Sequence, residues 1–274
     1  MNSYTNTKVV ESKVTVAKRF SLGGLAIMLP GLAVAVLGLA NPASNFQAPE
    51  YLLLSYISLI AGTIISTIGG RLAERWLVEP RDDQKLAKTL KGLDKRYRLI
   101  NYNTPADHLL LTPTGLFVIL MKSDSGPIKF DGKQWIQPGG IRRIWHDWRH
   151  GGLGNPIAEA ETQIKKLQGW LKLVELDAPI ASLIVFGNPK AVLEVADGRD
   201  DIMALKDLKV YLLQHTTPAI PSALYRTLSD AISPQTEPEP DDDGDEPATE
   251  PDAPKSAGPS SRRRRRRQKK GQAA

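Results

Sequence analysis

The strongest constraint in this sequence is a pair of uncharged apolar stretches near its start. Residues 21–40, SLGGLAIMLPGLAVAVLGLA, and residues 51–70, YLLLSYISLIAGTIISTIGG, contain no Asp, Glu, Lys or Arg. A helix of about 20 residues spans a hydrocarbon core of about 30 Å. A buried helix of a soluble protein would normally carry polar residues along one stripe. The two stretches therefore predict two transmembrane helices joined by a connector over residues 41–50.

Basic residues flank the two stretches and are absent from the connector, NPASNFQAPE. The flanking residues are Lys8, Lys13, Lys18, Arg19, Arg71, Arg75 and Arg81. The positive-inside rule then predicts cytoplasmic residues 1–20, an external connector and a cytoplasmic remainder, in a cell membrane crossed twice. The alternative is a signal peptide cleaved after Ala40, but the second stretch would still return the chain to the cytoplasm.

Small residues recur at four-residue spacing within the second stretch, as Gly62, Ser66 and Gly70. Such a face lets two helix backbones approach closely, so it is a candidate surface for self-association. Because glycine is common in membrane helices, the same spacing is equally compatible with no association.

A globular domain is expected over residues 79–233. In RDDQKLAKTLKGLDKRY the leucines recur at helical spacing and acids precede bases, which predicts a leading helix. Short β-rich runs follow, separated by turn signals such as TPA, PTG and SDSGP. The runs YRLINYN, DHLLLT, LFVILM and IKFDGKQWIQ predict a meander of adjacent, mostly antiparallel strands.

Helices and strands alternate in the second half of this domain. NPIAEAETQIKKLQGWLKLV predicts a helix, ASLIVFG and LKVYLL predict two strands buried on both faces, and SALYRTLSDAIS predicts a closing helix. The expected fold class is α/β, a mixed sheet flanked by helices. The chain contains no cysteine, which excludes disulfides, thiolate catalysis and cysteine-ligated metal centres.

Three sequence blocks occur in a fixed order between residues 82 and 190. They are DDQKLAKTLKGL, DHLLLTPTGLFVILMKSDSG, and NPIAEAETQIKKLQGWL followed by LIVFGN. Their order and spacing resemble the NERD domain, a nuclease-related domain of the PD-(D/E)xK superfamily. The resemblance implies a restriction-endonuclease-like core. It also implies a chemistry in which carboxylates hold Mg²⁺, while a lysine two residues beyond one of them orients or deprotonates the attacking water.

Carried over residue by residue, this motif is only partly present. Asp107 stands at the position of the family's first sheet aspartate, and Lys122 at that of the motif lysine. The acid expected two residues before the lysine is Leu120, which cannot ligate a metal. The helix glutamate is replaced by Gln84, and Glu159 occupies a position where the family tends to have glutamine.

Two interpretations follow from this partial motif. In the preferred one the site has decayed, and the domain is a binding or scaffolding module that needs no cofactor. In the other, the missing carboxylate has migrated to Glu159, which with Asp107 would supply two ligands of a Mg²⁺-dependent nuclease assisted by Lys122. For Asp107 alone, a turn residue that caps local backbone is a further interpretation.

A loop of sequence IRRIWHDWRH interleaves arginine with tryptophan. Its candidate binding residues are Arg142, Arg143, Trp145, Trp148 and Arg149. Arginine on phosphate with tryptophan stacked on bases suits single-stranded nucleic acid. Both residue types also favour the headgroup depth of the inner leaflet, and packing of the loop onto the domain is the third interpretation.

Residues 234–274 separate their charges into two blocks. Nine carboxylates lie within residues 237–252 and nine basic residues within 255–270. A tail rich in proline, acid and serine cannot offset its ordering entropy, so we expect disorder. The basic block contains Arg262, Arg263, Arg264, Arg265, Arg266, Arg267, Lys269 and Lys270. Its candidate partners are nucleic-acid phosphate, anionic lipid or the acidic block of the same tail.

Overall fold

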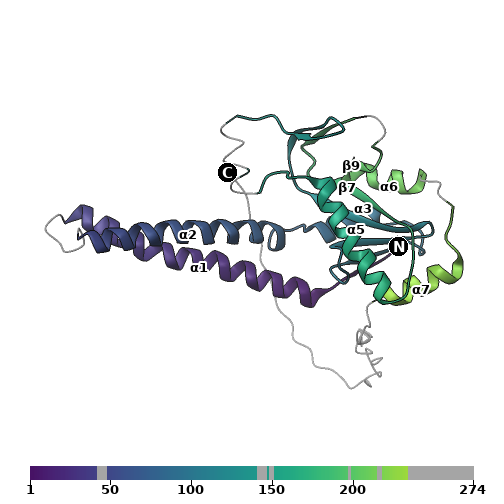
Figure 1. The fold of residues 1–274 in the computed structure, drawn as a ribbon, viewed down its shortest axis with the longest axis horizontal. Coiled ribbons are helices and arrows are strands. Elements are labelled where there is room, and N and C mark those ends of the chain that lie inside the picture. The colour runs from purple at the N-terminus through teal and green to yellow at the C-terminus, as the bar shows by residue number, and fades with distance from the viewer. Residues whose placement is uncertain (42–47, 141–146, 148–150, 197–198, 215–217, 234–274) are drawn as a thin grey trace, which may run out of the picture. The chain divides into compact units, whose positions relative to one another are not determined.

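Two long helices precede the globular part of the molecule. The computed structural model describes residues 1–41, 48–140, 147, 151–196, 199–214 and 218–233. Helices α1 (Thr7–Ala40) and α2 (Pro49–Trp76) run side by side in opposite directions (Figure 1). Both are long and apolar enough to cross a membrane, as expected for a protein with two spans. They contain the two uncharged stretches and extend beyond them towards the globular part.

Small residues form the contact between α1 and α2. The small buried positions recur every seven residues, as Ala17, Gly24, Gly31 and Gly38 on α1 and as Ser55, Gly62 and Gly69 on α2. A Cβ atom added to Gly62 would lie only 2.7 Å from the Cβ of Met28. A seven-residue repeat keeps one stripe facing the partner helix, and glycine lets the two backbones touch.

Of the three residues expected to mediate self-association, two pack against α1 of the same chain and one does not. Gly62 faces Met28, and Ser66 lies against Gly24, so both contact α1 of the same chain. A Cβ atom added to Gly70 would meet open space. Self-association through these small residues stays a prediction.

The globular part is built on a six-stranded mixed sheet of order β1-β2-β3-β4-β7-β9. The strands are β1 (Asn2–Thr5), β2 (Arg98–Asn101), β3 (His108–Thr112), β4 (Gly115–Lys122), β7 (Ile180–Phe186) and β9 (Ile202–Ala204). β2, β3 and β4 are antiparallel, and β1, β7 and β9 each run parallel to their neighbours. The expected meander is therefore present only from β2 to β4.

A second, three-stranded sheet has the order β6-β5-β8. It contains β5 (Gly126–Phe130), β6 (Trp135–Ile136) and β8 (Ala191–Val195). The expectation that IKFDGKQWIQ continues the main sheet is wrong. After β4 the chain turns away at Gly126, whose φ of 81° suits glycine, and β5 then pairs with β6 and β8.

Helices cover both faces of the main sheet, which confirms the expected fold class. α3 (Asp82–Leu90) and α6 (Leu205–Gln214) pack on one face, and α5 (Pro156–Leu173) and α7 (Ser222–Ile232) pack on the other (Figure 1). Side chains alternate between these faces along each strand. In β4, Phe117 and Ile119 join the α3 face, whereas Leu116 and Val118 join the α5 face.

The prediction of a strand at LKVYLL is wrong, because residues 208–213 lie in α6. Leu208 and Leu212, four residues apart, are buried against the sheet, while Val210 and Leu213 are exposed. This is the periodicity of a helix with one apolar face. The neighbouring strand β9 is only three residues long, and the sequence analysis missed it.

Strand β1 ties the first residues of the chain to the globular part. It pairs in parallel with β2, with Tyr4 opposite Ile100. The amino group of Met1 donates a hydrogen bond to the carbonyl oxygen of Leu93 at 2.6 Å. α1 begins at Thr7, directly after β1, so the chain leaves the sheet through α1 and returns to it after α2. Met1–Gln235 form one compact unit.

Candidate functional site

The motif lysine lies at the end of β4, on the face covered by α5. Leu116, Val118 and Leu120 all point to this face, and Lys122 continues the same alternation. The strand is held on its far side by β7, where Lys122 is opposite Phe186. The sheet therefore directs the Lys122 side chain towards the first turns of α5.

Glu159 meets Lys122 from α5. The Nζ atom of Lys122 donates hydrogen bonds at 2.8 Å to each carboxylate oxygen of Glu159 and at 3.1 Å to the carbonyl oxygen of Leu153. Asn155 caps the helix by accepting from the backbone N–H of Ala158, which places Glu159 in the first turn, where the helix dipole favours an acid. An ammonium group has three donors, and all three are used here.

Asp107 lies just before β3, and it contacts α5 at Gln163, one helical turn after Glu159. Its Oδ2 atom accepts a hydrogen bond from Arg75 of α2 at 2.8 Å and another from Nε2 of Gln163 at 3.4 Å. Its backbone N–H donates to Oε1 of Gln163 at 3.3 Å. Gln163 follows Glu159 by four residues, so the two project from one side of α5. The Asp107 side chain thus bonds α2 and α5 rather than the backbone of its own turn.

The three candidate residues are therefore gathered around one side of α5, but their partners differ. Lys122 and Glu159 contact each other directly. Asp107 is paired with Arg75 instead. Within the described residues, no group of three or more histidine, aspartate and glutamate side chains is arranged to hold a metal ion. Both candidate metal ligands already have a cationic partner.

Leu120 occupies the position of the missing acid and is buried. It belongs to an apolar cluster with Leu153, Ala160 and Phe186, among others. A carboxylate at this position would be taken out of water beside apolar side chains, at a cost of several kcal/mol unless it were paired. The residues around position 120 therefore suit leucine and do not suit a carboxylate.

Gln84 has a structural role at the start of α3. Its Oε1 atom accepts a hydrogen bond from the backbone N–H of Arg81 at 3.0 Å, as the third residue of a capping box does. The neighbouring Asp83 is buried and accepts a hydrogen bond from Nε of Arg81 at 3.1 Å. This hydrogen bond raises the pKa of the Arg81 guanidinium. The acids of α3 thus stabilise the helix start.

His108 and Tyr102 form a buried polar cluster on the α3 side of the sheet. Nδ1 of His108 lies 2.8 Å from Oδ1 of Asn101, and the His108 and Tyr102 ring centroids are 5.1 Å apart. Burial lowers the pKa of His108 to about 4 and raises the pKa of Tyr102. His108 is therefore neutral at physiological pH and does not add a positive charge to the candidate site.

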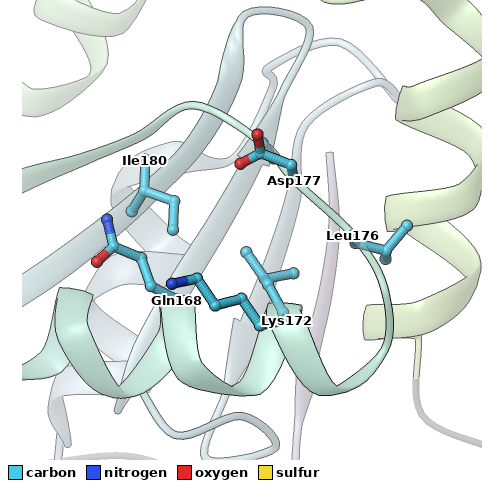
Figure 2. Close-up of a pocket in the computed structure, with 7 residues that line it drawn as sticks. Gln168, Lys172, Leu176, Asp177 and Ile180 are labelled. Atoms are coloured by element: carbon cyan, nitrogen blue, oxygen red, sulfur yellow. The ribbon is translucent and has the colours of Figure 1, made fainter.

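A pocket of about 200 Å³ lies where α5 leads into β7. Gln168 and Lys172 project from α5, and Leu176, Asp177 and Ile180 come from the segment that follows it (Figure 2). Lys122, Glu159 and Asp107 do not line this pocket. It is separate from the candidate site.

Sequence reasoning missed the partners that fix these side chains, namely Arg75, Leu153 and Gln163. For Gln163 a signal was present, because it follows Glu159 by one helical turn. The candidate binding residues of the loop, Arg142, Arg143, Trp145, Trp148 and Arg149, lie outside the described residues. So do the tail and its basic block, residues 262–270.

The fold defines the class of the protein as a mixed sheet flanked by helices that follows a helical hairpin of membrane-spanning length. Residues 71–187 match the family model described as the nuclease-related domain, NERD. This range runs from the end of α2 to the residue after β7 and includes Asp107, Lys122 and Glu159. The matched range includes most of the sequence blocks that indicated a resemblance to this domain. No curated protein and no solved structure matches the chain.

Proposed function

We propose that this chain is a membrane-anchored protein whose nuclease-related domain binds its target without cutting it. The observation that carries the proposal is the arrangement around Lys122, whose ammonium group is fully bonded to Glu159 and Leu153. Two residues earlier, Leu120 fills the place of a metal-binding acid with apolar packing. A catalytic lysine would have to give up a carboxylate partner before it could act on water.

The proposed placement of the domain is cytoplasmic. Basic residues flank the hairpin and are absent from its connector, which favours this orientation. The pairing of β1 with β2 supports an even number of crossings, because residues 2–5 and 98–101 belong to one sheet. Cleavage after Ala40 would remove β1 from that sheet, so the pairing favours an uncleaved hairpin.

The placement can be tested with single cysteines, because the chain has none of its own. Ser44→Cys marks the connector and Ser256→Cys marks the tail. In intact cells, a membrane-impermeant maleimide should label the connector variant and leave the tail variant unlabelled until the cells are lysed. Labelling of the tail variant in intact cells would overturn the proposed orientation.

Absence of cleavage is tested on the full chain in detergent, because β1 lies outside residues 79–233 and completes the sheet. Labelled single- and double-stranded DNA and RNA are incubated with Mg²⁺ or Mn²⁺. We expect no cleavage beyond that of a parallel preparation of Lys122→Met. Cleavage that disappears in both Lys122→Met and Asp107→Asn would overturn the proposal.

The second candidate function is a Mg²⁺-dependent nuclease with a rearranged site. It is favoured by one observation, that Glu159 contacts Lys122 while Asp107 contacts Gln163 one turn along the same helix. Under this function Asp107 and Glu159 would hold the metal and Lys122 would orient the attacking water. The cleavage assay above distinguishes the two functions.

The basic block of the tail, residues 262–270, is proposed to bind nucleic acid or anionic lipid, and the arginine-tryptophan loop is a further candidate contact. The sequence supports the proposal for the basic block, because eight of its nine residues are basic. Electrostatic binding should weaken steeply as salt rises. Replacing Arg262–Arg267 with glutamine should abolish the salt-dependent part of the binding free energy. Parallel titrations with oligonucleotides and with phosphatidylglycerol vesicles identify which partner is preferred.

A further inference from the structure

A second pocket lies where the two long helices meet the globular part. Its volume is about 290 Å³, close to the lower end of the range of ligand pockets, about 300 to 1,000 Å³. The residues that line it are Val9, Lys13, Leu72, Arg75, Trp76, Tyr102, Thr104 and Asp107. They come from α1, from α2 and from the segment between β2 and β3. The pocket is large enough for a small polar group, not for a polymer.

The charged side chains of this pocket carry an excess positive charge. Lys13 and Arg75 are cationic and Asp107 is anionic, which gives a formal charge of +1 from two cations and one anion. Arg75 bonds Asp107 through Nη2, and a guanidinium has further donors. Among the described residues, Lys13 makes no ion pair. A ligand with one negative charge would balance the pocket.

The pocket begins at the expected depth of lipid headgroups and extends away from the membrane. Arg75 follows the second uncharged stretch by five residues, about 7.5 Å along a helix, and Lys13 precedes the first stretch by eight residues, about 12 Å. The headgroup region is about 5 to 8 Å thick on each side of the core. The Trp76 ring lies 4.9 Å from the Tyr102 ring and 5.3 Å from the Arg75 guanidinium carbon. Tryptophan, tyrosine and arginine are the residues that favour this layer.

We propose that this pocket binds the phosphodiester headgroup of an anionic phospholipid, with Lys13 and Arg75 as its phosphate-binding residues. The Tyr102 and Trp76 rings and Thr104, whose hydroxyl donates to the carbonyl oxygen of Ala106, surround the polar part. Leu72, which is closer to the apolar stretch of α2 than Arg75, adjoins the glycerol backbone. A phosphodiester has the single negative charge that the pocket lacks, whereas a phosphomonoester would meet Asp107 with a second charge. The inference rests on the membrane placement proposed above and is independent of whether the domain cuts nucleic acid.

The test uses the purified full chain in an uncharged detergent at physiological salt, titrated with short-chain phosphatidylglycerol and followed by isothermal titration calorimetry. Short-chain phosphatidylcholine is the neutral control. Lys13→Gln should weaken phosphatidylglycerol binding about ten-fold, the effect of losing one charge-assisted hydrogen bond. Lys8→Gln and Lys18→Gln each remove one positive charge from α1 outside the pocket. They should change the affinity for phosphatidylglycerol by less than about two-fold, because salt screens distant charges.

The controls separate this pocket from the tail and from free anions. The basic tail is present in all these variants, so its contribution cancels in their comparison. Equal losses in the three lysine variants, or equal binding of phosphatidylcholine, would overturn the proposal. Glycerophosphoglycerol, the soluble phosphodiester that phosphatidylglycerol leaves on deacylation, is titrated alone as the soluble arm. Binding as tight as that of phosphatidylglycerol would assign the site to a free phosphodiester instead. The nuclease assay and the cysteine labelling report separately on the function proposed above.

Discussion

Two ion pairs lie on opposite faces of the main sheet, and they differ in which partner is buried. On the α3 face, the Asp83 side chain is 4% exposed and its partner Arg81 is 19% exposed. On the α5 face, the Lys122 side chain is 13% exposed and its partner Glu159 is 46% exposed. Asp83, the buried acid, lies in the first turn of α3. Glu159, the accessible acid, contacts Lys122, which stands at the position of the motif lysine.

The difference separates a structural acid from one that is available for chemistry. Asp83 is enclosed by its own helix and by Arg81, so a solvent ion cannot reach it. Glu159 presents its carboxylate to solvent while it holds Lys122, so a ligand or an ion could compete for it. On the α5 face the buried position is taken by Leu120 instead of an acid.

The largest effect is expected when an acid is placed on the α5 face. Leu120→Asp would bury a carboxylate in an apolar cluster and should lower the free energy of unfolding by about 5 kcal/mol. Leu120→Asn is the matched control without charge. Chemical unfolding of both variants in detergent measures the difference. If millimolar Mg²⁺ restores the Asp variant but not the Asn variant, the α5 face retains the geometry of a metal site.

The next effect concerns the buried pair of the α3 face. Arg81→Ala would leave Asp83 buried without its partner and should cost about 4 kcal/mol of unfolding free energy. Arg96→Ala is a suitable control, since Arg96 pairs with Asp94 on the surface and should cost less than about 1 kcal/mol. Similar losses in the two variants would show that burial does not distinguish these pairs.

Much of this contrast could be predicted from the sequence, because it depends on local patterns. The apolar run of β4 followed by Lys122, and the Asn155-Pro156 start of α5, place both elements correctly. Asp107 and Glu159 were identified as the remaining acids near the motif. Alternation along β4 also places Leu120 and Lys122 on one face.

The parts that the sequence did not predict depend on contacts between distant segments. The short polar strand β1 pairs with the edge of β2, and NSYT lacks the apolar alternation that would have predicted a strand. Arg75 was recognised as a flanking charge, but its partner Asp107 lies 32 residues away in the chain. In α6, the mostly apolar run LKVYLL suggested a strand buried on both faces, and packing of Leu208 and Leu212 on the sheet decided for a helix.

The pH dependence of stability should originate on the α3 face. Burial lowers the pKa of His108 to about 4, from an ordinary value of 6.5. Between these values the unfolded chain binds a proton that the folded chain does not, so stability falls as pH falls from 6.5 to 4. The total loss is about 3 kcal/mol, since each pKa unit corresponds to about 1.4 kcal/mol.

His108→Gln removes this titration. Its stability should change less than that of the unmodified chain over the same pH interval, even if it is less stable at pH 7. Thermal unfolding at a series of pH values measures both curves. Parallel curves would mean that His108 does not account for the dependence.

The smallest effect is expected for the pair that joins α2 to the candidate site. Arg75 and Asp107 are 49% and 42% exposed, and exposed ion pairs contribute about 0 to 1 kcal/mol. A double-mutant cycle with Arg75→Gln and Asp107→Asn isolates their coupling from the contact of Arg75 with Trp76. We expect a coupling energy of about 0.5 kcal/mol. A value above about 2 kcal/mol would place this pair with Arg81 and Asp83, among the pairs that the fold cannot lose. Asp107 would then be a structural acid, and the α5 face would keep Glu159 alone as an acid available for chemistry.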